Sequence, residues 1–579
     1  MGTGWLAKLR AFTRGRAPLW VVAIVVVANV LSSGFYFRLD LTGDGRYTLT
    51  AYTREQLSNL GDPVYVKCYL AGRLPLEFFR LRLRVEDMLE EYSVASGHRV
   101  HYRFEDPNGE SDAAARSALR EQLLAQGARP LTVRQRTSDG GSSEALVFPT
   151  LTVGYRGRQT TINVLAPQAT FGTEASLAVA IQELEYRLTT ALERVVHPQH
   201  RRLAFLEGHG TLEAVESVSL ARELSADYQV VRLALSDSVG SLDSCAVVVV
   251  ADPKEPFTER EKLVLDQYLM QGGRLLLLIS PVQVLTDSLE QGANTFAMAR
   301  SVNLDDQLFR YGLRLAPVLL QDLQCAMIPV NTALAGQPSR FTPMPWPYCP
   351  LLTPSPGSLA SRHVELVYSQ YPGRVDVVGG DDGLAKQELL TTSARSRRRQ
   401  VPCLVSLQEL ESGFRPEEFD GGRQAVGVMV SGQFSSAFAH RPLSEIAPGQ
   451  RFEFKSHGVP ARLALFADGT LGRNGLQREG GRLQPLPVGY DRYMRRTFGN
   501  AELLQHVVYL LDGREGLLSL RGRRVSACRL DPVRFSANPV LWQVVNIILP
   551  FVLLVVLGSL VPYLRARYYG AGVRRRRAR

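Results

Sequence analysis

The chain of 579 residues lacks the short motifs that mark the commonest catalytic and metal-binding sites. Its six cysteines are scattered, with no Cys-x-x-Cys pair and no Cys/His spacing suited to zinc, so neither a dithiol redox centre nor a zinc site is expected. No glycine motif for dinucleotides or phosphates occurs, so ATP hydrolysis is not expected. A Gly-x-Ser-x-Gly elbow is also missing. These absences argue against an enzyme, and we expect no cofactor and no resident metal.

The cysteines leave two interpretations open. An even number permits disulfides outside the cytosol, although their pairing cannot be derived from sequence. Buried free thiols are the alternative, because free cysteine is commonly buried. We expect the second.

Acidic residues are absent from both ends of the chain, and all of its excess positive charge lies there. Residues 1–18 carry four basic side chains, residues 564–579 carry seven, and the net charge is +11, so the residues between are neutral overall. The basic residues are Lys8, Arg10, Arg14, Arg16, Arg565, Arg567, Arg574, Arg575, Arg576, Arg577 and Arg579. Because the central region has no excess of basic charge, we expect no nucleic acid partner.

Each basic tail adjoins a long run without charged residues. Leu19–Phe37 and Val540–Tyr563 are long enough to cross a bilayer, so we predict transmembrane helices at 19–37 and 540–563. A cleavable signal peptide is the alternative for the first run. Since basic residues favour the cytoplasmic side, both tails are predicted to be cytoplasmic and near anionic lipid. The region between would then be periplasmic, in a bacterial inner-membrane protein with a hairpin topology.

Residues 38–170 are predicted to form a first α/β domain. A strand at Val64–Leu70, a helix at Leu76–Ala95 and a strand at His101–Glu105 would give a βαβ unit, which resembles half of a thioredoxin-like domain. Alternation at Ala145–Tyr155 predicts one further strand.

An amphipathic helix at Thr173–Val196 is predicted within a linking segment, residues 171–200. We expect it to pack within its own chain, although a partner helix is the alternative. From 201 to 530 strands and helices alternate. Apolar runs such as Ala246–Ala251 and Arg274–Ser280 are typical of a parallel sheet covered on both faces, which predicts a flavodoxin-like, doubly wound domain with insertions.

Polar residues follow several of these strands. Glu207, His209 and Asp252 lie where ligands bind in open parallel sheets, and they could form a polar pocket. Asp468 follows the apolar strand predicted at Ala461–Ala467 and resembles a ligand position. The alternative is that these side chains only satisfy loop backbone groups or, for Asp468, a turn.

Three further predictions concern the insertions. Proline-rich Pro338–Pro356 is predicted to be a loop, and Lys386–Arg399, with its run of arginines, a solvated loop. Ala425–Gly432 and Ala461–Ala467 are predicted to be strands of the parallel sheet.

Six stretches resemble the ABC-transporter auxiliary family that includes GldG-type, gliding motility-associated substrate-binding proteins of Bacteroidetes. They are RLDLTGDGRYTLT at 38–50, PVYVKCYLAGRLP at 63–75, EDMLEEY at 86–92, FLEGHGTLE at 205–213, ADPKEPFTEREKLVLDQYLMQGGRLLLLISPV at 251–282 and NLDDQLFRYGLRL at 303–315.

The resemblance implies a non-catalytic subunit that acts with an ABC permease and an ATP-binding subunit, in gliding motility or secretion-related export. It also implies that the central region is similar to the GIFT domain, a class I glutaminase-like fold, here without the catalytic Cys-His pair. The alternative is a module that binds carbohydrate or peptide, or a hydrolase, in which Glu207, His209, Asp252 and Asp468 would line the site.

Overall fold

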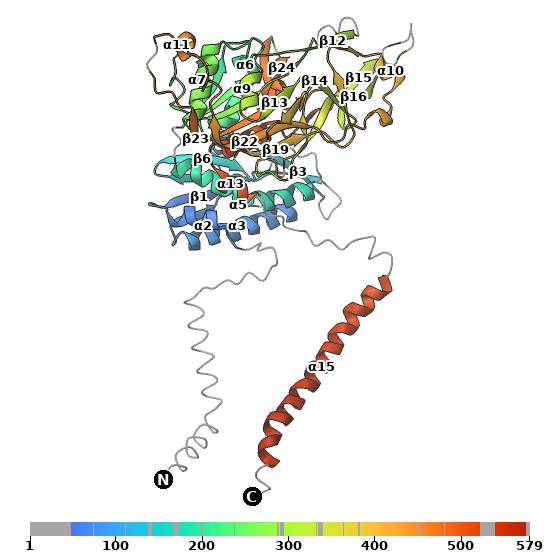
Figure 1. Ribbon diagram of the computed structural model, residues 1–579. Coiled ribbons are helices and arrows are strands. Elements are labelled where there is room, and N and C mark those ends of the chain that lie inside the picture. The colour runs from blue at the N-terminus through green and yellow to red at the C-terminus, as the bar shows by residue number, and fades with distance from the viewer. Residues whose placement is uncertain are drawn as a thin grey trace. The chain divides into compact units, whose positions relative to one another are not determined.

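The computed structural model describes residues 48–521 and 539–574, apart from short internal gaps. The gaps are residues 73, 110–111, 137–141, 166–172, 198–200, 237, 286–288, 290–293, 332, 334–337, 339, 363, 380–382, 450–451 and 480. Residues 48–521 belong to one compact unit, the body, and 539–574 to a second. The body is a mixed α/β structure. Figure 1 shows its N-terminal lobe (48–197) and its C-terminal lobe (201–521). The two lobes have separate hydrophobic cores.

The N-terminal lobe begins with α2 (Ala51–Ser58), and the side chain of Thr50 caps this helix. Its four-stranded sheet has the order β2-β1-β5-β6. The strands are β1 (Val64–Cys68), β2 (Val100–Phe104), β5 (Thr150–Tyr155) and β6 (Arg158–Asn163). β1 and β2 are parallel and α3 (Leu76–Ala95) joins them, which confirms the predicted βαβ unit. α4 (Ala113–Ala125) and the hairpin of β3 (Leu131–Arg136) and β4 (Ser142–Val147) complete the lobe's first part.

The prediction of one strand at Ala145–Tyr155 was wrong, since β4 ends at Val147 and β5 starts at Thr150. Pro149 separates them because proline has no backbone N–H to donate to a strand ladder. The N–H of Thr150 instead donates to the carbonyl of Phe148 at 2.9 Å.

The long helix α5 (Thr173–Val196) has the predicted bounds. Its apolar stripe, which includes Leu184, Leu188 and Leu192, is buried in the core of the N-terminal lobe. The prediction that this helix packs within its own chain is therefore confirmed.

Five parallel strands form the centre of the C-terminal lobe, in the order β8-β7-β9-β10-β23. They are β7 (Arg202–Glu207), β8 (Gln229–Ala234), β9 (Cys245–Ala251), β10 (Arg274–Leu278) and β23 (His457–Phe466). Helices α6 (Ala214–Ser225), α7 (Glu259–Met270) and α12 (Asn500–Leu511) pack against these strands. The parallel sheet predicted from the apolar runs is thus confirmed.

Antiparallel strands extend this sheet on one side. β22 (Ala425–Ser435) pairs antiparallel with β23, and β19 (Ala385–Thr391), β16 (Phe341–Pro354) and β15 (Cys325–Asn331) follow in order. The prediction that Ala425–Gly432 belongs to the parallel sheet was therefore wrong in direction. Its residues are buried like those of a parallel strand, and burial alone does not reveal strand direction.

The predicted loop at Pro338–Pro356 is mostly the strand β16. Pro343, Pro345 and Pro347 are spaced by two residues, so their missing N–H groups lie along one edge of the strand. The strand still pairs with β15, across a register shift. The composition indicated a loop because proline is typical of turns. The sequence alone does not distinguish such prolines from prolines placed along one edge of a strand.

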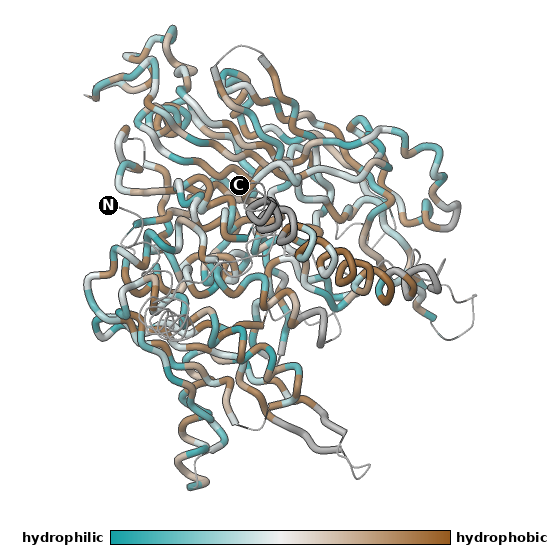
Figure 2. The backbone as a smooth tube through the Cα atoms, turned by 90° about the horizontal axis from the view of Figure 1, so that it is seen from below, coloured by the Kyte–Doolittle hydropathy of each residue, from teal (hydrophilic) through white to brown (hydrophobic). Residues whose placement is uncertain are grey.

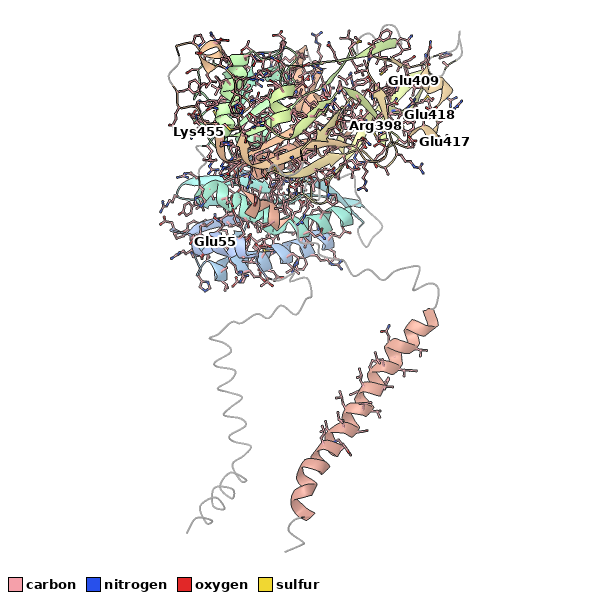
Figure 3. The ribbon with its side chains drawn as sticks, viewed as in Figure 1. Glu55, Arg398, Glu409, Glu417, Glu418 and Lys455 are labelled. Carbon is pink, nitrogen blue, oxygen red and sulfur yellow. The ribbon has the colours of Figure 1, made fainter. Side chains whose placement is uncertain are left out.

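The arginine-rich run is also a strand, β20 (Ser396–Gln400), which pairs with β14 (Val318–Asp322). Arg397 lies 2.5 Å from Glu418, and Arg399 lies 2.9 Å from Glu409. Figure 3 shows Arg398, Glu409 and Glu418 at the same end of the C-terminal lobe. The prediction of a solvated loop was wrong because the backbone of this run pairs with β14, a strand about 80 residues earlier in the chain that the run itself does not reveal.

Further short elements surround the sheet. They are β11 (Val282–Val284), β12 (Asn294–Ala299), α9 (Asp305–Arg310), β13 (Leu313–Ala316), β17 (Val367–Tyr368), β18 (Arg374–Val377), β21 (Cys403–Ser406), α10 (Glu409–Ser412), η1 (Pro416–Glu418), α11 (Leu443–Ile446), η2 (Gly469–Gly472), β24 (Asn474–Glu479), β25 (Arg482–Val488), β26 (Tyr490–Asp491), β27 (Arg496–Thr497) and α13 (Glu515–Leu520).

Buried charged side chains join the two lobes. Arg194 of α5 donates from Nε and Nη2 to the carboxylate of Asp227, both at 2.9 Å, and Tyr509 donates to the same carboxylate at 2.6 Å. Arg514 donates to Glu193 at 2.7 Å. Burial acts to raise the pKa of Asp227, but Arg194 outweighs this and holds the pKa below its usual range.

The second unit contains α15 (Pro539–Arg574). Within the described part of the chain, its segment Asn546–Leu564 is the one candidate long and apolar enough to cross a bilayer, judged by length and composition. Much of this helix is coloured as hydrophobic in Figure 2. The predicted span at 540–563 thus falls on a continuous apolar helix, and the one predicted at 19–37 lies outside the described residues.

The cysteines that the structure describes carry free thiols, and those of Cys68, Cys245 and Cys349 are buried. Cys325 and Cys403 are partly buried. The prediction of free thiols is confirmed for these five residues, and Cys528 lies outside the described part.

Candidate functional site

The candidate site lies at the carboxyl edge of the parallel strands, where the loops after β7 and β9 meet. The carbonyl of His209 accepts hydrogen bonds from the backbone N–H groups of Lys254 and Glu255, at 2.6 and 2.9 Å. The N–H of Leu212 donates to the carbonyl of Ala251 at 2.9 Å. The predicted proximity of these loops is therefore found at the level of the backbone.

Glu207 ends β7 and points toward solvent. Its carboxylate is about half exposed and lies 3.6 Å from Arg232 of β8. An exposed pair of this kind contributes little to stability. Glu207 is thus available to solvent but faces the outer strand rather than the loop after β9.

His209 adopts a left-handed backbone conformation, with φ of 54°, between two glycines. Its ring lies 4.1 Å from the ring of Phe257, and its Nε2 lies 3.0 Å from Glu261. Burial acts to raise the pKa of Glu261, but hydrogen bonds from Thr258 and the nearby imidazole hold it below its ordinary value. The imidazole therefore connects its loop to the start of α7 through a side chain, and not through the loop backbone groups that the alternative proposed.

Asp252 follows β9 and is almost fully buried. Its Oδ1 lies 3.5 Å from Nη1 of Arg300, which follows β12. Its carboxylate also lies against Gly469, where any Cβ atom would overlap it. The close approach of the loop after β23 thus requires glycine at position 469.

Asp468 is completely buried and accepts four hydrogen bonds. The N–H and hydroxyl of Thr470 donate to Oδ1 at 2.8 and 2.7 Å. The hydroxyl of Ser369 and the N–H of Gln370 donate to Oδ2 at 2.5 and 3.2 Å. Burial raises the pKa of Asp468, against the effect of these hydrogen bonds. Its observed contacts are those of a cap for η2.

The four predicted residues therefore separate into two groups. Asp252 and the Asp468–Gly469 turn meet at the ends of β9 and β23, whereas Glu207 and His209 face Arg232 and Glu261. No hydrogen bond joins the side chains of the four within the described residues. They share one edge of the sheet but do not converge on one point.

Two polar residues at this edge could not be recognised from the sequence as part of the site. Arg300 reaches Asp252 from an inserted strand, and the hydroxyl of Ser280 accepts from the N–H of Gly469 at 2.9 Å. Ser280 ends the apolar run Arg274–Ser280, and nothing in the sequence near Arg300 indicates its partner. Both contacts depend on long-range pairing.

A cleft of about 590 Å³ lies beside Arg300, next to the carboxyl end of β10. Its lining includes Ile279, Phe309 and Arg314. Asp306 also lines it and is engaged by Lys262 at 2.8 Å. This volume is in the usual range of small-ligand sites. Over the described residues, no group of three potential metal ligands occurs.

Comparisons with known proteins assign most of the C-terminal lobe to a family. A family model described as an ABC-type uncharacterized transport system matches residues 200–506, and a domain family of unknown function matches residues 43–154. No curated protein matches the chain.

Two solved structures show weak likeness. The N-terminal domain of mmIFT52 is 12% identical, with 54% of this chain and 96% of that chain covered and a TM-score of 0.31. A putative ThuA-like protein from Parabacteroides merdae is 10% identical, with 54% and 90% covered and a TM-score of 0.25.

Proposed function

The chain belongs to the family described as an ABC-type uncharacterized transport system, and from that membership we propose that it is a membrane-anchored, non-catalytic subunit of an ABC-type transport complex. The match over residues 200–506 carries this proposal, because it spans more than half of the chain. ATP hydrolysis would come from a separate ATP-binding subunit, and a permease would be the membrane partner. Gliding motility or secretion-related export is the process we propose for the complex.

The proposed topology is a hairpin in the bacterial inner membrane, with both termini cytoplasmic and the body periplasmic. The apolar helix α15 supports the second anchor. The body's two described ends also lie together: Gly516 of α13 packs directly against Tyr52 of α2, and Tyr52 donates to Glu193 of α5. A body whose first and last helices touch is suited to attachment at one membrane face by both ends.

The finer fold assignments also belong to this proposal. The order β2-β1-β5-β6, with a βαβ unit followed by a hairpin and α5, supports a thioredoxin-like N-terminal lobe. The order β8-β7-β9-β10-β23 corresponds to 2-1-3-4-5, the flavodoxin-like order, and supports a glutaminase-like GIFT domain. Boundaries at 38–170, 171–200 and 201–530 remain predictions.

Co-purification tests the partner role. Tagged full-length chain, solubilised in mild detergent, should bring down one ATPase and one permease in constant ratio. A matched pair of variants in α15 separates anchoring from partner binding. Leu553→Arg places a charge in the apolar segment at a cost of about 3 kcal/mol, and Leu553→Ala does not.

We expect Leu553→Arg to be partly released from membranes by alkaline carbonate and Leu553→Ala to remain. A chain that carbonate fully extracts would disprove the anchor. A chain that stays in the membrane but purifies alone would disprove the partner role.

A second candidate function is binding of a carbohydrate or peptide, or hydrolysis, at the carboxyl edge of the C-terminal lobe. The cleft of about 590 Å³ at the end of β10 favours it. Screening the full chain with short sugars and peptides should then raise its melting temperature, and Arg300→Gln should reduce the shift. Turnover of amide or ester substrates that His209→Ala abolishes would favour the hydrolase.

A further inference from the structure

One face of the N-terminal sheet is only partly covered. Val64 and Val66 of β1 point to the core, which includes residues of α3 and α5. On the opposite face Tyr69 packs with Leu123 of α4, so this helix covers one end of the sheet. The other end of the same face is open.

The strand register shows which residues lie there. His101, Tyr65, Gly154 and Gln159 are paired across β2, β1, β5 and β6, so they form one row. Tyr65 is 60% exposed, and its ring is stacked on that of His101 with 5.4 Å between centroids. The histidine covers one face of the exposed tyrosine ring, and the other face is a platform on which an apolar surface can lie.

A hollow lies beside this platform because Gly154, the cross-strand neighbour of Tyr65, has no side chain. The cleft there has a volume of about 620 Å³, and its lining includes Gln159 and the ion pair of Asp62 with Arg156, whose charges cancel.

Arg158 is paired with Tyr155 in the row that faces the core, and its guanidinium donates to the carbonyl of Val195 of α5, so it lies on the other face of the sheet. On the open face, the amide of Gln159 can donate hydrogen bonds to a ligand that lies on Tyr65.

The next row along the strands is cationic and hydroxylated. It contains Arg103, Lys67, Thr152 and Thr161, again paired across the four strands. Arg103 and Lys67 are both well exposed and share one carboxylate, that of Glu105. One acid for two cations leaves net positive charge next to the platform.

We infer that this open face binds a chain of acidic sugars. The apolar face of a sugar ring would lie on Tyr65, its hydroxyls would bond to Gln159 and Thr161, and its carboxylate would pair with Lys67. An acidic peptide would satisfy the cations but would leave the exposed rings uncovered. The site lies outside residues 200–506, which match the transport family, and is independent of the proposed role in transport.

Binding can be measured by fluorescence anisotropy with the full chain in detergent micelles. The probes are a labelled oligomannuronate and its neutral counterpart, an oligomannoside. The acidic probe should bind at least about tenfold more tightly, and its affinity should fall with added salt. Tyr65→Ala should weaken it about tenfold and Lys67→Gln about fivefold. Tyr493→Ala, which removes a similarly exposed tyrosine from the C-terminal lobe, is the control and should change nothing.

Gly154→Leu tests the hollow without removing a contact. A Cβ at residue 154 would lie 3.7 Å from its nearest atoms, so a side chain can enter the hollow without moving the backbone. This variant should melt like the natural chain and lose the acidic probe. Binding retained in both Gly154→Leu and Tyr65→Ala would overturn the inference. Equal affinity for the neutral oligosaccharide, or equal competition by polyglutamate, would overturn it as well.

Discussion

Substitution of Asp227 by asparagine should destabilise the junction between the lobes more than any exposed change. The Asp227 side chain has no exposure to solvent, and it accepts two hydrogen bonds from Arg194 and one from Tyr509. Asparagine keeps the size but loses the charge and turns a donor toward the guanidinium. Removing one partner of a buried pair typically costs about 3–5 kcal/mol.

Because Arg194 is partly exposed, we expect the loss of stability in Asp227→Asn to lie at the lower end of this range. About a fifth of its side chain reaches solvent, so water can hydrate part of the unpaired guanidinium. We therefore expect Asp227→Asn to lower the free energy of unfolding by about 3 kcal/mol. Glu418→Gln is the control, because its pair with Arg397 is well exposed and should contribute less than about 1 kcal/mol.

The same pair predicts a pH dependence. The pKa of Asp227 in the folded chain is lower than in the unfolded chain, because Arg194 outweighs burial. Its contribution to stability is therefore complete above the unfolded pKa of about 4 and is lost as the pH falls below that value. The difference in stability between the natural chain and Asp227→Asn should shrink over this acidic range.

Urea denaturation of the full chain in detergent, followed by circular dichroism at neutral and acidic pH, measures both effects. A double variant, Arg194→Leu with Asp227→Leu, should be less destabilised than Asp227→Asn, because no unpaired charge remains buried. If Asp227→Asn loses no more stability than Glu418→Gln, the buried pair does not stabilise the junction between the lobes. The same conclusion follows if its loss of stability relative to the natural chain is unchanged in acid.

Three further predictions follow from buried groups. Burial raises the pKa values of Cys68 and Cys325 to about 12, so at about pH 8 both thiols should resist maleimide until urea unfolds the chain, as mass spectrometry can show. Asp468→Ala should lower the free energy of unfolding by about 2 kcal/mol, because it orphans several buried donors; a melting temperature equal to the natural one would refute the capping role. Gly469→Ala should lower the free energy of unfolding by about 2 kcal/mol, since its Cβ would overlap the Cα and Cβ of Asp252; alanine at position 252 keeps both atoms, so the paired variant Gly469→Ala with Asp252→Ala should recover little of this loss in urea denaturation.

The sequence predicts well those helices and strands whose own consecutive residues form a recognisable apolar pattern. Helices α3 and α5 have the predicted bounds because each repeats an apolar stripe over five or more turns. The runs at Ala246–Ala251 and Arg274–Ser280 predict a parallel sheet because strands buried on both faces need no polar alternation.

The candidate site was only partly predictable, because its position depends on local patterns but its side-chain contacts depend on residues distant along the chain. Its strand-end position follows from the alternation of strands and helices, and the contacts between the loops after β7 and β9 agree with it. Whether His209 faces a ligand or Glu261 depends on where α7 begins relative to its loop. The contact between Asp252 and Arg300 joins residues 48 positions apart through an inserted strand.

The sequence by itself determined the charge distribution, the apolar run of α15 and the parallel centre of the large sheet, since each of these is written in consecutive or regularly spaced residues. Only the tertiary structure decided that prolines and arginines form strands β16 and β20, and that Asp227, 33 residues from Arg194, joins the two lobes. Strand pairing and buried ion pairs depend on partners that are distant along the chain, and a local pattern carries no record of which partner will be present.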